Sequence, residues 1–227
     1  MFSSFYLCSN TYYELEKDVD SNHKIKDDID KYIKINEKDD IYKVDFKALK
    51  EINSDTIAYL RVKGTNIDYV VVKGNDNSYY LTHNFNKEYN IAGWIFADYH
   101  NTFDGNDKNM IIYGHNTKDG SMFETLINVL DRKWQGDSDN HIITLITEKG
   151  KYKYKVFSTY SIEPEDYYIN TIFNNNNEYT EFLKTIKSRT SYDYGVEVSS
   201  NDKLLTLSSC IGKGQKRVVL HAKLIDS

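Results

Sequence analysis

Two cysteines, Cys8 and Cys210, stand near opposite ends of this 227-residue chain, and neither belongs to a CxxC-type pair. A disulfide framework and a paired-cysteine metal site are therefore excluded. Cys210 closes the predicted strand Leu204-Leu205-Thr206-Leu207-Ser208-Ser209 and precedes a loop that contains Gly212 and Gly214. A thiol at a strand end beside such a loop is accessible to substrate. This context favours Cys210 as a nucleophile.

Arg217 stands seven residues after Cys210, at the mouth of the same predicted hairpin, in a chain with four arginines and 25 lysines. A guanidinium there can lower the pKa of the thiol and donate hydrogen bonds to a developing oxyanion. Acyl transfer needs both effects. The residues alone leave open the alternative that Arg217 is a surface cation at a strand end.

A cysteine nucleophile needs a general acid for the leaving amine, and histidine is the usual residue. His115 follows the apolar run Met110 to Tyr113 at a glycine turn, which predicts a position on a barrel rim and favours it over His100. Four residues of strand separate His221 from Arg217 by about 13 Å, so His221 is interpreted as structural. His23 is placed on an exposed helix, and His83 and His141 in polar turns.

The composition predicts a globular protein with one sizeable core, since 40% of the residues are hydrophobic and 14% aromatic. The net charge of −5 and the interspersed lysines and carboxylates indicate no nucleic-acid partner. No segment reaches the ~20 apolar residues that span a bilayer. Residues 1–10 begin with an apolar, aromatic stretch that lacks the basic region of a signal peptide. We interpret them as the remnant of an N-terminal membrane anchor, with a packed terminus as the alternative.

Helical periodicity marks the N-terminal part of the chain. Apolar residues recur at spacings of mostly four between Tyr12 and Ile35, which predicts an amphipathic helix, and a second helix is predicted over Asp45 to Ile52. Residues 11–53 thus form a predicted helical segment. Two inserted helices are predicted over Met122 to Leu130 and Glu178 to Ser188, and the run Asn174 to Asn177 supplies the N-cap of the latter.

Short runs rich in β-branched and aromatic residues fill the rest of the chain, and Lys63-Gly64-Thr65-Asn66 reads as a hairpin turn between the first two. Eight strands with only two helices between them do not make a βαβ series. We therefore predict a mostly antiparallel, closed or nearly closed β-barrel over residues 54–227, with residues 11–53 packed on it. The predicted strands are Thr56 to Val62, Ile67 to Val72, Trp94 to Ala97, Met110 to Tyr113, Ile142 to Thr147, Tyr152 to Ile162, Lys203 to Ser209 and Val218 to Ile225.

These motifs together resemble the sortases, and specifically class B, from about Asn66 to the C-terminus. Any one motif alone is weak, but the combination is highly specific. The resemblance rests on Tyr113-Gly114-His115-Asn116, Asp119-Gly120-Ser121-Met122-Phe123, Thr206-Leu207-Ser208-Ser209-Cys210, Arg217, Asn77-Ser78-Tyr79-Tyr80-Leu81, Phe96-Ala97-Asp98-Tyr99 and the closing run Val218 to Ile225.

The resemblance implies an eight-stranded barrel with N-terminal helices and a long helix before the cysteine strand. It implies Cys210 as nucleophile, His115 as general acid/base, and Arg217 as the residue that stabilises the oxyanion and positions substrate. Three positions depart from the family pattern: Ser209 replaces a common threonine, His100 a common arginine, and Ile211 an acidic residue of some class B members. The implied substrate-binding positions are Leu81, Tyr168, Ile169, Ser208 and Asn77.

No cofactor and no metal are expected. The run Asp104-Gly105-Asn106-Asp107 lacks the alternating ligand spacing of a calcium loop, because Lys108 stands where an oxygen ligand is needed.

The implied reaction is transpeptidation. A thiolate cleaves an Asn-Pro-x-Thr-x type sorting motif of a secreted protein after Thr, and a peptidoglycan amine resolves the thioacyl-enzyme. The resemblance further implies a membrane-anchored enzyme on the outer face of a Gram-positive cell, and we expect a monomer. Two alternatives stay open at this point: a cysteine hydrolase with water as acceptor, and a non-catalytic cell-surface binding domain in which Cys210 is dispensable.

Overall fold

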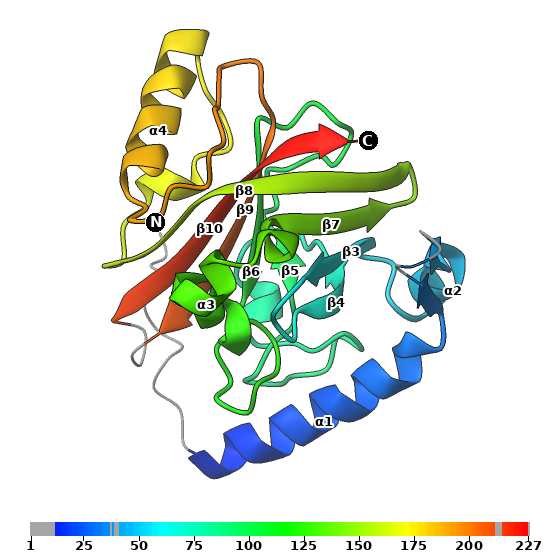
Figure 1. Ribbon diagram of the computed structural model, residues 1–227. Helices are drawn as coiled ribbons and strands as arrows, with labels where there is room; N and C mark the ends of the chain where they lie inside the picture. The colour runs from blue at the N-terminus through cyan, green and yellow to red at the C-terminus, as the bar shows by residue number, and fades with distance from the viewer. Residues whose placement is uncertain (1–11, 37, 39–40, 212–214, 227) are drawn as a thin grey trace.

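Eight strands close a barrel in the computed structural model, which describes residues 12–36, 38, 41–211 and 215–226 (Figure 1). The strands are β3 (Thr56–Val62), β4 (Asp68–Val72), β5 (Phe96–Ala97), β6 (Asn109–Gly114), β7 (Ile142–Thr147), β8 (Gly150–Ile162), β9 (Leu204–Ile211) and β10 (Lys216–Asp226). Their order around the barrel is β10-β8-β7-β3-β4-β5-β6-β9. The predicted fold class is confirmed.

Two parallel contacts make this a mixed barrel. Within the described residues, neighbouring barrel strands run antiparallel except for β4 with β5 and β6 with β9. A parallel neighbour requires a crossover connection, and here β7, β8 and the helix after them return the chain to the starting end. The C-terminal ends of β6 and β9 therefore lie at the same rim of the barrel.

The N-terminal segment differs from the prediction in one respect. The helix α1 (Tyr12–Asp30) ends before Ile35, and β1 (Ile33–Asn36) instead pairs with β2 (Ile41–Val44). Residues of β1 alternate between half-buried and exposed, which is the period of a strand and not of a helix. The helix α2 (Phe46–Ile52) begins as predicted, because the Asp45 side chain accepts a hydrogen bond from Ala48 N at 3.0 Å.

Short helices fill the connections between strands. They are the 3₁₀ helices η1 (Tyr79–Leu81), η2 (Glu124–Leu130), η3 (Ser138–His141) and η4 (Tyr167–Ile169), and the α-helix α3 (Arg132–Gln135). The predicted Met122 to Leu130 helix is η2. Its buried residues Leu126 and Val129 lie three apart and continue from buried Phe123, which matches the three-residue period of a 3₁₀ helix.

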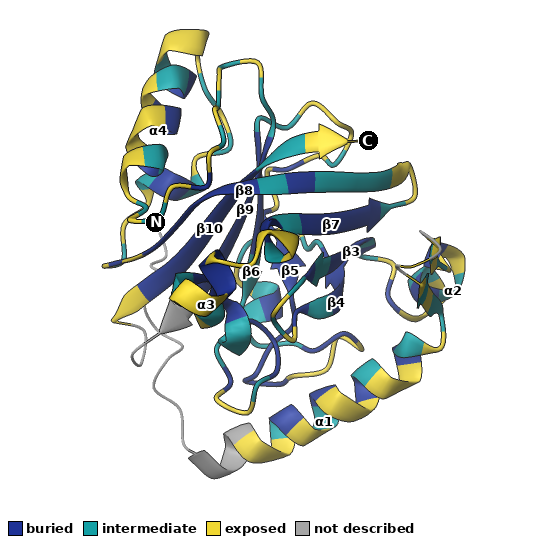
Figure 2. Ribbon diagram, viewed as in Figure 1, coloured by how far each residue is buried: buried dark blue, intermediate teal, exposed yellow. Residues whose placement is uncertain are grey.

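The helix α4 (Asn176–Ser188) lies between β8 and β9 in the chain, where a long helix was expected. Asn175 caps it by accepting a hydrogen bond from Glu178 N at 3.0 Å. Figure 1 shows α4 and α1 on opposite sides of the barrel, and both turn a buried stripe inward in Figure 2.

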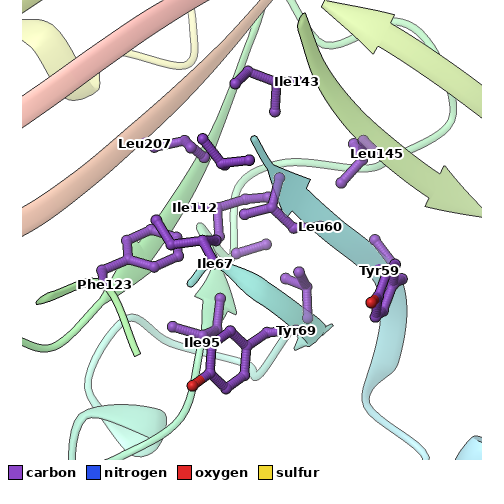
Figure 3. Packing of buried hydrophobic residues seen from close by; sticks show 14 of the residues in the cluster. Tyr59, Leu60, Ile67, Tyr69, Ile95, Ile112, Phe123, Ile143, Leu145 and Leu207 are labelled. Atoms are coloured by element: carbon purple, nitrogen blue, oxygen red, sulfur yellow. The ribbon is translucent and has the colours of Figure 1, made fainter. Parts of the chain in front are cut away.

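The core fills the barrel interior. Leu60, Ile112, Leu145 and Leu207 are fully buried and point toward one another from four strands (Figure 3). Burial of each such side chain contributes about 1.5–3 kcal/mol. A second apolar cluster packs α4 and η4 against the outer face of β8, β9 and β10. The outer face of this part of the sheet is therefore also covered.

The predicted anchor remnant, residues 1–10, lies outside the described residues. None of the helices in the described part of the chain is long and apolar enough to cross a membrane.

Candidate active site

Three neighbouring strands bring the predicted catalytic residues to one rim. In the register, Cys210 on β9 lies opposite Arg217 on β10, and Ser209 lies beside Gly114, the last residue of β6. His115 and Cys210 each follow directly after this last pair of the parallel register, so both lie at the same end of β6 and β9. Residues opposite one another share a face of the sheet. The backbone thus brings His115, Cys210 and Arg217 to one rim of the barrel, and we refer to these three residues as the row.

His115 is half-buried and held by a backbone contact. Its Nε2 lies 2.8 Å from Leu81 O, and its own carbonyl accepts from Phe123 N at 2.9 Å. A carbonyl oxygen only accepts hydrogen bonds, so Nε2 carries the proton. The neutral ring then has its lone pair on Nδ1, which is the atom available for proton exchange with substrate.

The environment of His115 favours the neutral ring. Burial lowers the pKa of His115 below its ordinary value, the hydrogen bond to Leu81 O opposes this, and the charge of Arg217 lowers the pKa further.

Arg217 is buried, with 6% of its surface exposed, and its Nη1 donates to Lys216 O at 3.1 Å. The surface-cation alternative therefore does not fit this residue. For Cys210 the structure describes the backbone position alone, and the predicted loop at Gly212 and Gly214 lies outside the described residues.

The expected substrate-binding residues fall into two groups. Leu81 ends η1 and contacts the imidazole through its carbonyl. Tyr168 and Ile169 lie on η4, and the hydroxyl of Tyr168 is 3.1 Å from Ser208 Oγ on β9. Ser208 stands two residues before the nucleophile on the same strand, so η4 borders the row of catalytic residues.

Asn77 is connected to a buried carboxylate. Asp98 accepts hydrogen bonds from Asn77 Nδ2 at 2.7 Å and from the Tyr113 hydroxyl at 2.9 Å. Its other oxygen is 2.8 Å from His100 Nδ1. Because Tyr113 neighbours Ser208 across the β6–β9 pair, this network brings Asn77 into contact with the strand pair that carries Ser208. The contribution of Asp98 and Tyr113 was missed, and the only signal was their place in the quoted motifs.

The alternative base, His100, lies away from the row. Asp98, two residues before His100, donates its backbone N–H to Ile111 O. Ile111 stands four residues before His115, and four residues of strand correspond to about 13 Å. The register therefore favours His115 over His100.

The other histidines have interaction partners outside the row. His221 is buried on β10. His141 was expected in a polar turn but is buried at the end of η3, because its ring packs between Trp134 and Tyr194 and its Nε2 contacts Gln135 O at 2.8 Å. His83 stacks on Tyr79, and exposed His23 pairs with Asp119.

In the loop that contains Asp104 and Asp107, the carboxylates accept hydrogen bonds from donors of the same loop. Asp104 accepts from Thr102 Oγ1 and Asn106 N, and Asp107 accepts from Thr102 N and Phe103 N.

The helix α1 supports the wall behind His115. Asn22, only 2% exposed, donates to Gly93 O at 2.9 Å and accepts from Asn90 Nδ2 at 3.2 Å. Gly93 has φ +58°, and a Cβ there would lie 2.9 Å from His115 Cδ2. The role of Asn22 was missed, although it fills the gap in the apolar stripe between Val19 and Ile25.

Asn22→Ala is expected to lower the free energy of unfolding by about 1–3 kcal/mol, because Gly93 O loses a buried donor. It should also lower kcat/KM by about 3- to 10-fold, because a looser wall no longer limits the orientation of His115. Denaturation and peptide cleavage measure the two effects. Exposed Lys24→Ala on the same helix is the control, and equal kcat/KM in both variants would mean that α1 contributes only to stability.

Comparisons with known proteins agree with this geometry. A family model described as "Sortase domain" matches residues 60–225. Sortase B of Listeria monocytogenes is 37% identical over 188 residues, which cover 80% of this chain and 74% of the relative. A crystal structure of sortase B from B. anthracis in complex with AAEK1 superposes with a TM-score of 0.82 at 32% identity, covering 93% of this chain and all of the other. A Staphylococcus aureus sortase B–substrate complex gives a TM-score of 0.74 at 30% identity, covering 93% of this chain and 94% of the other.

Proposed function

This chain belongs to the sortase family and is a sortase B-like cysteine transpeptidase, and we propose that it cleaves an Asn-Pro-x-Thr-x type sorting motif after Thr and transfers the protein to a peptidoglycan amine. The observation that carries the assignment of residues is the row formed by His115, Cys210 and Arg217 at one barrel rim.

In the first half-reaction the Cys210 thiol gives its proton to Nδ1 of the neutral His115 ring, and the resulting thiolate attacks the Thr carbonyl carbon. The electron pair of the C=O bond moves to oxygen, and Arg217 donates to the oxyanion that forms. When the C–N bond breaks, protonated His115 gives its Nδ1 proton to the leaving amine, while Nε2–H keeps its hydrogen bond to Leu81 O. The product is a thioacyl-enzyme with a neutral imidazole.

In the second half-reaction the incoming amine attacks the thioester carbonyl. His115 Nδ1 takes the proton that the amine must lose, and the carbon–sulfur bond breaks to release the thiolate. A new amide bond joins Thr to the acceptor. The proton then passes from His115 Nδ1 to the thiolate, which returns the enzyme to its starting protonation state.

The proposed peptide groove lies between η1 and η4. On the η1 side, Leu81 O contacts His115. On the η4 side, the Tyr168 hydroxyl contacts Ser208, and Ile169 follows Tyr168 in the helix. Asn77 is connected through the network at Asp98. The Staphylococcus aureus relative has been solved as a substrate complex, which supports a peptide partner for this chain.

Membership of the sortase family implies that the enzyme acts at the cell surface. We extend this to the outer face of a Gram-positive membrane, with residues 1–10 as the anchor remnant and a monomer as the working form. The family match sets aside the non-catalytic alternative, and the peptidoglycan amine as acceptor is part of our proposal.

The test of the reaction is a panel of sorting pentapeptides incubated with and without an amine nucleophile. Mass spectrometry should find the Thr-amide adduct when the amine is present, and a slower release of free Thr carboxylate without it. Hydrolysis at one unchanged rate under both conditions would identify a cysteine hydrolase. Cleavage at another bond would contradict the proposed motif.

Arg217→Lys separates a directional donor from a simple charge. Lysine keeps the charge but loses the planar fork of donors. We expect kcat/KM to fall by about 10²–10³-fold, as for deletion of one oxyanion donor, with little change in melting temperature. If charge alone matters, Lys restores most of the activity that Ala loses. Two variants with near-normal kcat/KM would remove Arg217 from the active site.

A second readout of the same variants is the pKa of His115 from NMR titration. The charge of Arg217 lowers this pKa in the wild type. Removal of the charge in Arg217→Ala favours the imidazolium, so the pKa should rise, whereas Arg217→Lys should keep most of the depression.

A further inference from the structure

A buried hydrogen-bond network, formed by Tyr160, His221, Thr206 and Asn109, lies beneath η4, the short helix that carries Tyr168 and Ile169. His221 lies at its centre on β10 and is 0% exposed. The ring packs against Phe157 and Tyr160, with centroid distances of 6.1 and 5.6 Å. The transpeptidation steps described above do not use this residue.

The direction of each hydrogen bond follows from the donors available. Thr206 Oγ1 donates its single proton to Asn109 Oδ1 at 2.6 Å. His221 Nδ1, which is 2.8 Å from Thr206 Oγ1, must therefore be the donor in that contact. Nε2 of a neutral ring then accepts from the Tyr160 hydroxyl at 2.9 Å. Burial lowers the pKa of His221 to about 3, so the ring is neutral near pH 7, as this pattern requires.

Both ends of the hydrogen-bond network reach η4. At one end Asn109 Nδ2 donates to Asn170 O at 2.9 Å and lies 3.4 Å from Tyr168 O. At the other end the Tyr167 hydroxyl donates to the Tyr160 hydroxyl at 3.5 Å. The first residue of η4 and the residue after its last are therefore connected through His221.

We propose that His221, protonated on Nδ1 alone, is a positioning residue that holds η4 in place for peptide binding through Tyr160 and Thr206. The inference rests on the proposed function, in which Tyr168 and Ile169 line the substrate groove. His221 touches neither substrate nor the catalytic row. Loss of the hydrogen-bond network should therefore change the shape of the groove and leave the chemical step largely intact.

Tyr160→Phe and Thr206→Val each remove one hydroxyl from the hydrogen-bond network and keep the approximate size of the side chain. KM for a sorting pentapeptide should rise about 3- to 10-fold, the equivalent of one lost neutral hydrogen bond, with kcat within about twofold of wild type. Tyr179→Phe is the matched control. This tyrosine belongs to the same buried cluster, but its hydroxyl donates to Lys108 O and Asp202 O.

His221 itself is tested by two further variants. His221→Phe removes both hydrogen bonds and should raise KM at least as much as Tyr160→Phe. His221→Gln retains a donor and an acceptor, so its KM should lie between those of wild type and His221→Phe. If His221→Phe does not fold, Tyr160→Phe and Thr206→Val carry the test.

Amide hydrogen exchange gives a readout that needs no substrate. Ile169 N donates to Asp166 O at 3.2 Å within η4, and its exchange should be faster in Tyr160→Phe and Thr206→Val than in Tyr179→Phe. KM equal to that of the control, or unaltered exchange, overturns the proposal. If the wild type cleaves no sorting peptide but the two variants still loosen η4, the proposed function fails and the anchoring of η4 stands.

Discussion

Cys210→Ala is expected to reduce cleavage of a sorting peptide to background, a loss of at least about 10⁴-fold in kcat, because no other group in the row can form the thioacyl bond. The thioacyl-enzyme should also disappear. Mass spectrometry of the intact protein, mixed with a slowly resolved peptide, measures the covalent adduct directly, and steady-state cleavage measures turnover.

Cys8→Ala is the matched control for the nucleophile, since Cys8 is the chain's other cysteine and lies in the predicted anchor remnant. It should cleave and form the adduct at the wild-type rate. Cys210→Ala should still bind the peptide with a similar Kd, because the groove residues are untouched. Retained turnover in Cys210→Ala, or an adduct on Cys8, would remove Cys210 from the mechanism.

His115→Ala is expected to lower kcat by about 10²–10⁴-fold, the usual effect of losing a general acid/base. The leaving amine then has no proton donor at Nδ1, and the incoming amine has no base. The melting temperature should change little, because the ring is half-buried and its hydrogen bond to Leu81 O is made to a single backbone carbonyl.

His100→Ala provides the comparison for His115→Ala. His100 contacts Asp98, which also holds Asn77 and Tyr113, so its loss should act on KM through the groove and leave kcat within a few-fold. The reverse result, an inactive His100→Ala and a nearly normal His115→Ala, would show that the wrong histidine has been assigned as the base. Both kinetic constants are needed for each variant.

Local patterns in the sequence were sufficient for much of the fold and for one half of the site. β3 and β7 have the predicted bounds, because each is an apolar, β-branched run between turn residues. The pairing of Cys210 with Arg217 was also predictable. Only six residues separate them, so the turn of the hairpin determines which residues face each other.

Tertiary structure decided the other half of the site. Gly114 and Ser209, the residues directly before His115 and Cys210, are partners because β6 and β9 pair in parallel across a long insertion, and no local period encodes that register. The end of α1 was also decided by pairing: Ile33 and Ile35 fit the helical spacing of four, but bonding to β2 makes them a strand.

The supporting contacts were the least accessible to sequence reasoning. Asn22 with Gly93, and His221 with Thr206 and Tyr160, are polar pairs from segments far apart in the chain. Buried polar groups must find partners, but composition and spacing do not say which partners. Residue types and short-range order therefore determined what chemistry this chain can perform and where strands such as β3 and β7 begin and end. The packing of distant segments decided which side chains meet, because hydrogen-bond satisfaction and close packing are properties of the whole fold.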